Sequence, residues 1–133
     1  DKNLKSVDET EVYLKKMQLE NSKMGGLGFF TVILKETNEA IGTSTALQRE
    51  KVNFIDIGYG FLPKGRGKGY AFEATKLIIQ YVREKFKQKK VYAFTVPENS
   101  ASQKLLKNLN FTYVGRKAIF GEEEDAVYEF EFT

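Results

Sequence analysis

The sequence contains neither cysteine nor histidine among its 133 residues. These absences exclude a disulfide framework, a zinc finger, a thiol nucleophile and a Ser-His-Asp triad. Any metal would need carboxylates alone, and we predict none. No apolar run approaches the length of about 18 residues that a transmembrane helix requires, and the first residues lack the pattern of a signal peptide. We therefore expect a cytoplasmic protein without a membrane partner, whose chemistry relies on carboxylates, hydroxyls, lysine, tyrosine and backbone amides.

Net charge is also small, because 21 basic and 18 acidic side chains give +3. The two signs alternate along most of the chain, which is typical of an ordinary hydrated surface. The length fits one domain with a self-supporting core, so we assign residues 1–133 to a single domain. The chain begins with Asp1 and not with methionine, from which we expect processing or truncation at this end.

Hydrophobic periodicity predicts a chain of alternating helices and strands. Ser6–Glu9 has the S-x-x-E form of a capping box, and Tyr13, Leu14 and Met17 follow at helical spacing. A second box, Ser100–Gln103, marks the start of the last predicted helix. Together the signals predict helices at 6–21, 69–87 and 100–109, and strands at 29–35, 40–48, 52–62, 90–96, 111–120 and 126–132.

The order of these elements predicts the fold class. Antiparallel hairpins lie on both sides of one β-α-β crossover, which should be right-handed. Asn110 is placed to end the last helix in the left-handed conformation. We therefore expect an α/β (α+β) fold with a mixed, mostly antiparallel central sheet and flanking helices.

The most informative stretch runs from a predicted strand through a glycine-rich loop into the longest predicted helix. Gly58 and Gly60 lie within the strand, which is typical of a bulge or of close approach by a ligand. The loop carries Lys64, Arg66 and Lys68 among glycines. Glycines allow N–H groups to converge on a phosphate, and a helix N-terminus adds about half a positive charge. These features predict a site for a polyphosphate ligand.

Two common phosphate-binding motifs do not fit this loop. A Walker A motif would need Lys and then Ser or Thr after Gly65, where the sequence has Arg66-Gly67. A Rossmann G-x-G-x-x-G motif that starts at Gly65 would lack its third glycine. The spacing that fits is an [RQ]-x-x-G-x-[GA] element, Arg66-Gly67-Lys68-Gly69-Tyr70-Ala71.

With this element, the sequence resembles the GNAT (GCN5-related) N-acetyltransferases, whose pyrophosphate loop for acetyl-CoA has the same form. The stretches Asp56–Tyr59 and Gly69–Ala74 are similar to the branch that acetylates ribosomal-protein N-termini. So is Asn99–Ser102, followed by Leu109–Phe111. The resemblance covers the chain from about residue 29 to its end, and it implies the GNAT fold with acetyl-CoA as the cosubstrate.

The resemblance also implies which residues contact acetyl-CoA. In the family, the strand before the loop splays from its neighbour, and the pantetheine arm bonds to the opened strand edge. Backbone groups of Tyr59, Phe61 and Leu62 would hold pantetheine, and Asn99 would hold the pantetheine or the acetyl end. The pyrophosphate would bind the backbone amides of Arg66, Gly67, Lys68, Gly69, Tyr70 and Ala71.

Without cysteine, an acetyl-thiol enzyme is excluded, so we expect a substrate amine to attack the thioester directly. Backbone amides near Tyr59 and Phe61 would stabilise the oxyanion. We predict Asp56 as the catalytic base, acting directly or through water. Many family members carry a thiolate-protonating tyrosine at the position of Leu106, so we predict Ser102 as its catalytic substitute here.

The N-terminal part departs from the family pattern. The family fold normally opens with an edge strand and a helix before the helix that we predict after Ser6, and we expect both pieces to be missing. The sheet would then have an uncovered edge, which would favour a homodimer.

Several residues are candidates for the side on which an acceptor would bind. Phe29, Phe30 and Tyr128 are the aromatic residues that we expect to line an acceptor pocket. The carboxylates of Glu122–Asp125 would attract a cationic amine.

These observations leave more than one function open. The leading prediction is an acetyltransferase for a primary amine, which could be a protein N-terminus, a polyamine, an aminoglycoside or another small amine. The alternative is a non-catalytic sensor that binds acyl-CoA, which the leucine at position 106 would suit. Nucleic-acid binding is the weakest reading, because the cations lie in one short loop and +3 releases few counterions.

Overall fold

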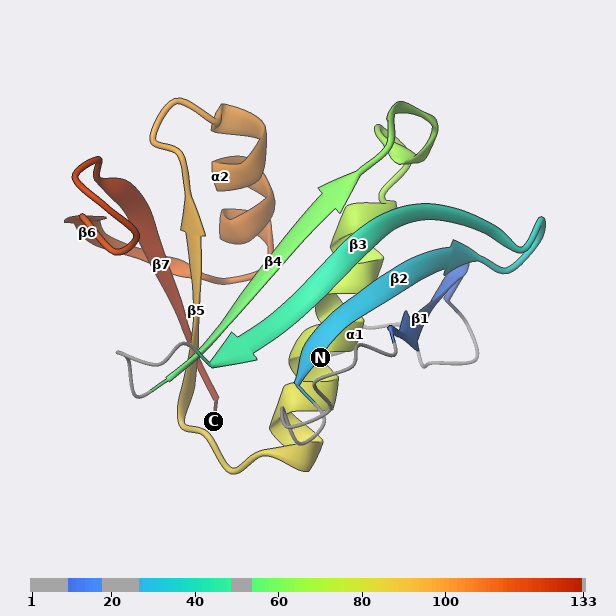
Figure 1. Ribbon diagram of the computed structural model, residues 1–133, viewed down its shortest axis with the longest axis horizontal. Coiled ribbons are helices and arrows are strands. Elements are labelled where there is room, and N and C mark those ends of the chain that lie inside the picture. The colour runs from blue at the N-terminus through green and yellow to red at the C-terminus, as the bar shows by residue number, and fades with distance from the viewer. Residues whose placement is uncertain (1–9, 18–26, 49–53, 133) are drawn as a thin grey trace.

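The computed structural model describes residues 10–17, 27–48 and 54–132. These residues form a seven-stranded sheet in the order β1-β2-β3-β4-β5-β7-β6 (Figure 1). Neighbouring strands are antiparallel except β4 and β5, which are parallel. The elements are β1 (Val12–Lys16), β2 (Gly28–Leu34), β3 (Glu39–Gln48), β4 (Ile55–Phe61), α1 (Tyr70–Lys85), β5 (Lys90–Thr95), α2 (Ser100–Asn108), β6 (Thr112–Lys117) and β7 (Asp125–Glu131).

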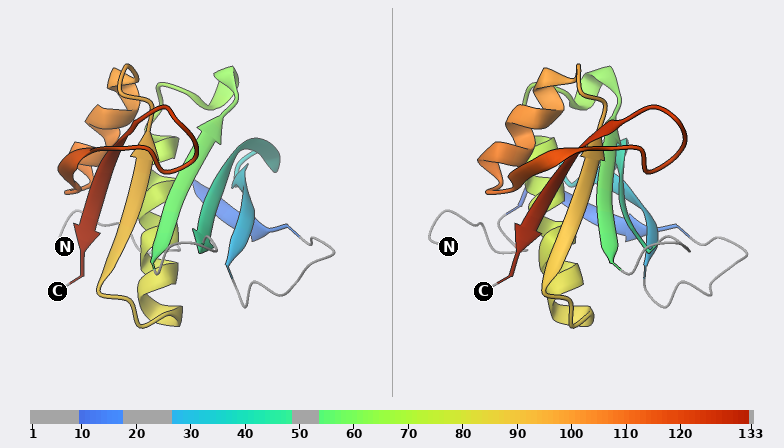
Figure 2. Two further views of the ribbon diagram at one scale, coloured as in Figure 1. Left: turned by 60° about the vertical axis from the view of Figure 1, so that its left-hand side comes forward. Right: turned by 90° about the vertical axis from the view of Figure 1, so that its left-hand side faces the viewer.

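Helices α1 and α2 cover the same face of the sheet (Figure 2). The main hydrophobic core lies beneath them, where Ile55 and Ile57 of β4 meet Ile78 of α1 and Leu106 of α2. On the opposite face, which we call the open face, the described residues place no helix (Figure 2). The mixed, mostly antiparallel sheet with flanking helices confirms the predicted fold class.

The helix predicted over 6–21 is wrong over Val12–Lys16, which forms the edge strand β1. Val12 pairs with Leu34 of β2, and Leu14 pairs with Val32. Val12 is fully buried and Leu14 packs against the core, so alternate residues face inward with the period of a strand. The sheet therefore has β1 at this edge, whereas the expectation that a strand and a helix are missing before Ser6 stays a prediction. Thr10, Glu11 and Met17 are not helical either, and the remaining parts of the predicted helix, 6–9 and 18–21, lie outside the described residues.

Strands β4 and β5 pair over only part of their length. The pairs run from Ile55 with Val91 to Ile57 with Ala93, and the strands then diverge (Figure 1). β4 stays paired with β3 as far as Phe61, without a register shift. Among the described residues, the segment after Ile57 therefore has a strand on one side only, which confirms the predicted splaying. The glycines of β4 mark this splay and not a bulge.

The ends of the helices match the sequence signals closely, with one correction. The N-cap of α2 is Asn99 and not Ser100, because the Oδ1 atom of Asn99 accepts the N–H of Ser102 at 3.0 Å. The Gln103 amide donates to Pro97 O, so the predicted capping box does not form. Asn110 has φ 70, which confirms the left-handed residue after α2. No helix in the described part of the chain has both the length and the apolarity to cross a bilayer.

Candidate functional site

A cleft of about 590 Å³ opens beside the splayed part of β4, on the face that carries the helices. Its walls come from β4, from the glycine-rich loop and from the first turns of α1 and α2. The structure therefore brings most of the predicted site residues to one place. The lining residues are Tyr59, Gly60, Phe61, Gly65, Arg66, Gly67, Gly69, Tyr70, Ala71, Phe72, Asn99, Ala101, Ser102 and Leu105.

The turn before α1 presents a run of backbone N–H groups. Gly67 and Gly69 have φ values of 75 and 80, a conformation that glycine adopts without strain. The first N–H to bond back is that of Glu73, which donates to Gly69 O at 3.1 Å. From Gly67 to Phe72, no N–H donates to a backbone carbonyl of the described residues. Such a run at a helix N-terminus is suited to hold an anion.

Arg66 is the first residue of the predicted phosphate-binding element, and its backbone N–H and its guanidinium make different contacts. Its backbone N–H donates to Pro63 O at 3.2 Å, so this amide is used within the loop. Its side chain lines the cleft, where Nε donates to Phe61 O at 3.0 Å. The amide predicted to bind pyrophosphate is thus occupied, and the guanidinium is the part of Arg66 that faces the cleft.

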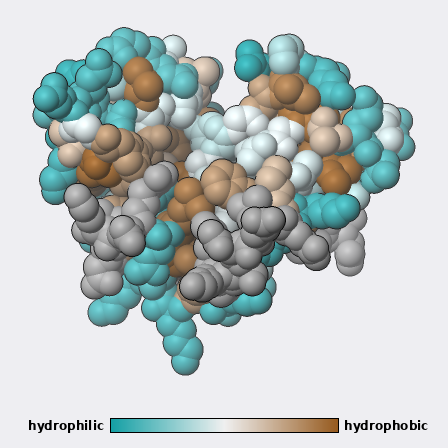
Figure 3. Space-filling view, viewed as in Figure 1, coloured by the Kyte–Doolittle hydropathy of each residue, from teal (hydrophilic) through white to brown (hydrophobic). Residues whose placement is uncertain are grey.

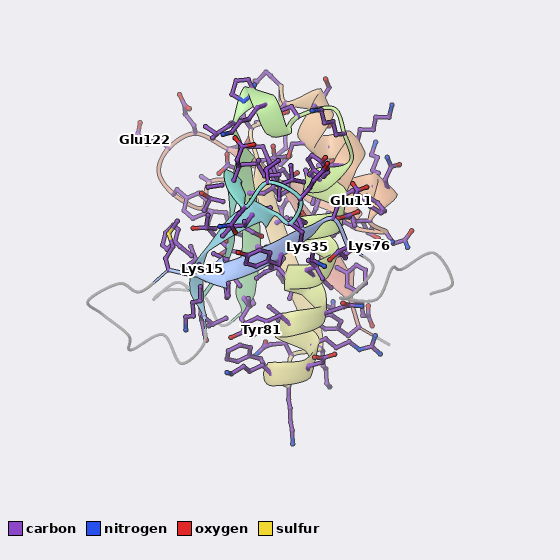
Figure 4. The ribbon with its side chains drawn as sticks, turned by 90° about the vertical axis from the view of Figure 1, so that its right-hand side faces the viewer. Glu11, Lys15, Lys35, Lys76, Tyr81 and Glu122 are labelled. Carbon is purple, nitrogen blue, oxygen red and sulfur yellow. The ribbon has the colours of Figure 1, made fainter. Side chains whose placement is uncertain are left out.

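The other two predicted cations lie outside the cleft lining. Lys64 pairs with Glu39 at 3.1 Å on the surface, where both side chains are about half exposed. Lys68 lines a smaller pocket of about 250 Å³ on the other side of α1, together with Glu11 and Lys76. Figure 4 shows Glu11 and Lys76 beside α1. The positive side chain of the cleft is therefore that of Arg66.

Opposite the loop, the hydroxyl groups of Tyr59 in β4 and Ser102 in α2 form a hydrogen bond. The two oxygens lie 2.6 Å apart, and either can be the donor. Because Asn99 caps the same turn of α2, these three residues form one connected group in the cleft wall. Burial raises the pKa of Tyr59 above its ordinary value, although the hydrogen bond with Ser102 acts in the opposite direction.

Leu62 does not belong to the cleft. Its N–H donates to Ile41 O and its carbonyl accepts from Gly65 N, both at 2.9 Å. Because backbone groups alternate in direction along a strand, the N–H groups of Phe61 and Tyr59 point away from β3, toward the gap. The backbone groups of Leu62 are therefore not available for the predicted contact with pantetheine. The N–H groups of Tyr59 and Phe61 have the direction that this contact requires.

Asp56 lies on the far side of β4 from the cleft. Its neighbours Ile55 and Ile57 face the core under the helices, so the Asp56 side chain faces the opposite way. It is 3% exposed, between Leu47 of β3 and Tyr92 of β5. Asp56 thus lies one residue before Ile57, the last residue of β4 that pairs with β5, but its side chain is on the open face.

The open face carries a row of aromatic rings near this point. Phe54 lies 4.4 Å from Tyr92 and 6.0 Å from Phe94 between ring centroids, and Phe94 lies 5.5 Å from Phe120. Phe120 is 52% exposed. Figure 3 views this face and shows hydrophobic surface between hydrophilic margins. These four residues, which we call the aromatic row, were missed at the sequence level because their faces depend on strand register.

Phe30, predicted to line an acceptor pocket, is 5% exposed and belongs to the core beneath the helices, so that prediction is wrong. Tyr128 is 1% exposed in the same core, but it also lines a second pocket of about 490 Å³ with Tyr113 and Arg116, so its role stays a prediction. The acidic connection between β6 and β7 projects past the open face of the sheet (Figure 2). Figure 4 shows Glu122 and Lys76 on opposite sides of the sheet. The predicted acidic residues therefore lie on the side of Asp56 and the aromatic row.

The geometry of the cleft fits coenzyme A. An added Cβ at Gly67 or Gly69 would meet open space, so a diphosphate can approach the backbone of this turn. The gap beside β4 offers backbone donors to an amide-containing arm. Among the described residues, no cluster of three or more carboxylates is arranged to hold a metal ion.

Residues 2–112 match the family model described as an acetyltransferase (GNAT) domain. Because this match covers more than half of the chain, the protein belongs to the GNAT acetyltransferase family. It is also similar to an uncharacterised N-acetyltransferase, p20, of Bacillus licheniformis, with 37% identity over 87 residues. That alignment covers 65% of this chain and 49% of the relative. The chain thus spans about half the length of the curated relatives that it matches.

This chain is also similar in structure to solved proteins of the GNAT family. A GNAT-family acetyltransferase from Bacillus anthracis has 28% identity and a TM-score of 0.68, over 77% of this chain and 65% of that one. A ribosomal-protein-S5-alanine acetyltransferase from Vibrio fischeri has 22% identity and a TM-score of 0.69. This match covers 82% of this chain and 63% of the Vibrio fischeri chain. At that identity the likeness concerns the fold alone.

Proposed function

We propose that this protein transfers the acetyl group of acetyl-CoA to a primary amine in a ternary complex. The observation that carries the proposal is the run of N–H groups from Gly67 to Phe72, which border the cleft at the start of α1. A helix N-terminus with such donors favours a diphosphate, which coenzyme A contains. Membership of the GNAT family supports acetyl-CoA as the donor.

The residues of the cleft would divide the binding of acetyl-CoA between them. When bound, acetyl-CoA supplies the acetyl group as a thioester. The amides of Gly67, Lys68, Gly69, Tyr70 and Ala71 would hold the pyrophosphate, with the Arg66 guanidinium beside them. The N–H groups of Tyr59 and Phe61, with Asn99 across the cleft, would hold the pantetheine arm and stabilise negative charge on the acetyl oxygen.

The amine would approach from the open face. The separation of β4 from β5 beyond Ile57 would give the amine a route from this face to the cleft, and the carboxylates of Glu122–Asp125 would attract a cation. The aromatic row offers apolar and cation-binding surface beside them. A primary amine that is protonated in water meets both requirements. A protein N-terminus, as in the ribosomal-protein branch, is one such amine, and polyamines and aminoglycosides are others.

The proton transfers would involve groups on both sides of the sheet. Asp56 faces the side from which the amine would come, so it is our candidate base, acting directly or through water. Ser102 lies in the cleft wall, where it would take part in protonating the leaving sulfur. Asp56→Asn should therefore lower kcat with little effect on coenzyme A affinity, whereas equal turnover would remove Asp56 from the mechanism.

A panel of amines tests the proposed function. Thiol release from acetyl-CoA would be followed with peptides of different N-termini, spermidine, an aminoglycoside and small amines, each against a control without amine. Amine-dependent release is the expected result. Thermal stabilisation by coenzyme A without release for any amine would instead favour the acyl-CoA sensor. Absence of both would overturn the proposal. A cytoplasmic location and a homodimer stay predictions, the second tested by light scattering.

A further inference from the structure

The hydrogen bond between Tyr59 and Ser102 leaves one proton of the pair for another acceptor. Two hydroxyl groups carry two protons, and the 2.6 Å contact uses one of them. The carbonyl of Ser102 lies 3.4 Å from the Tyr59 hydroxyl, which is a long distance for an O–H donor. Both side chains line the cleft. The pair can therefore donate one hydrogen bond into the cleft.

The phenol is the better acid of the two. A tyrosine hydroxyl has a pKa near 10, about 1.5 units above that of a thiol of the cysteine type. An aliphatic alcohol is far weaker and is poorly matched to a thiolate as a proton donor. With an ordinary pKa near 10 the phenol already carries its proton at neutral pH, and burial, which raises the pKa of Tyr59, acts in the same direction. Ser102 is suited to orient this phenol and less suited to give up a proton itself.

The position of Tyr59 agrees with this role. It lies on β4 two residues beyond Ile57, the last residue that pairs with β5. The gap that opens there is the place where an arm anchored at the α1 N-terminus would reach the open face. Leu106, by contrast, is 1% exposed and belongs to the core, so that position of α2 offers no proton donor.

We propose that the Tyr59 phenol, positioned by Ser102, protonates the leaving sulfur; this inference rests on the acetyl transfer proposed above. The nitrogen–carbon bond forms and the carbon–sulfur bond breaks, and the sulfur keeps the electron pair of that bond and takes the phenol proton. The protonated amine loses two protons to the base or to water, one before the attack and one after it. The phenolate recovers one proton from solvent through Ser102. The products are an N-acetyl amine, a thiol and one released proton, so the step is balanced.

Turnover by Tyr59→Phe tests the proposal, because phenylalanine keeps the ring and removes only the hydroxyl. We expect kcat to fall about a hundredfold, the usual lower range for loss of a general acid. Ser102→Ala should lower kcat less, and Ser102→Thr should restore it. A kcat of Tyr59→Phe within threefold of the unchanged protein would overturn the proposal, as would a larger loss in Ser102→Ala than in Tyr59→Phe.

A binding measurement tests the same contact without turnover. Calorimetry would compare coenzyme A with desulfo-coenzyme A, which lacks the sulfur. We expect the unchanged protein to prefer coenzyme A and Tyr59→Phe to lose that preference. The same preference in both proteins would overturn the proposal. If no amine is acetylated, the proposed function fails, yet this comparison still reports whether the phenol contacts the sulfur.

Discussion

The Nε atom of Arg66 donates a hydrogen bond to the carbonyl oxygen of Phe61 at 3.0 Å. This bond connects the glycine-rich loop to the end of β4, and so links the part of the cleft that would hold pyrophosphate to the part that would hold pantetheine. Lys64 lies two residues earlier in the same loop, but its charge is directed toward Glu39 on the surface. The two cations should therefore differ in their importance for binding.

Arg66→Gln should weaken coenzyme A binding about tenfold, the loss expected for one charged hydrogen bond. Lys64→Gln removes the same charge from the same loop and is the matched control. Its affinity should change less than about twofold, since exposed ion pairs contribute little. Calorimetric titration measures both. An equal loss in the two variants would mean that loop charge alone, and not the contact of Arg66, governs affinity.

Gly69→Asp should abolish coenzyme A binding at micromolar concentrations. The carboxylate would stand beside the N–H groups of Gly67 to Phe72 and repel the pyrophosphate. Gly69→Asn is the matched control, because both side chains have the same shape and both tolerate the positive φ of 80 at this position. Asn should lose no more than about tenfold. If Asp and Asn bind coenzyme A alike, the anion does not bind at this turn.

The fold class and most of the cleft could be predicted from the sequence because their signals are local. Gly67 and Gly69 adopt positive φ values where the loop must turn, and Asn110 adopts the left-handed conformation that ends α2. Each of these depends on neighbours in the chain. The [RQ]-x-x-G-x-[GA] element of the family adds a known spacing for the loop residues. Signals of this kind can be recognised in the sequence without knowing how the strands pair.

What the sequence could not predict depends on long-range pairing. Tyr13, Leu14 and Met17 have helical spacing, yet the segment forms β1 because pairing with β2 buries Val12 and packs the partly buried Leu14 against the core. The bond between Tyr59 and Ser102 joins positions 43 residues apart, and no spacing rule connects them. Asp56 illustrates the same limit, since only the register of β4 shows that it faces away from the cleft.

Thr75→Val should stabilise the fold by about 1 kcal/mol, because a buried hydroxyl without a partner costs about that much. Thr75 is 1% exposed, and its Oγ1 atom has no hydrogen-bond partner in the described part of the chain. Thr10→Val is the matched control, since Thr10 is 6% exposed but donates to Val12 O at 2.7 Å. That variant should lose stability. Urea unfolding compares the two, and destabilisation of both would contradict the assignment for Thr75.

The raised pKa of Tyr59 predicts how stability depends on alkaline pH. Burial favours the neutral phenol in the folded state, so its contribution is fully present below the unfolded pKa of about 10. It is lost as pH rises through the higher folded pKa. Tyr59→Phe removes this dependence, so its free energy of unfolding should fall less steeply above pH 10 than that of the unchanged protein, measured by urea titration.

Tyr128→Phe is the control that separates this effect on stability from proton donation. Burial also raises the pKa of Tyr128, whose side chain belongs to the core and does not line the cleft. Tyr128 also contributes, after burial, to the raised pKa of Tyr59, so Tyr128→Phe should move the titration of Tyr59 slightly toward lower pH without removing it. Both variants should therefore flatten the alkaline loss of stability. Only Tyr59→Phe should also remove the alkaline decline of kcat, because only the phenol of Tyr59 would have to be protonated during turnover. An alkaline decline of kcat that persists in Tyr59→Phe would assign that titration to another group.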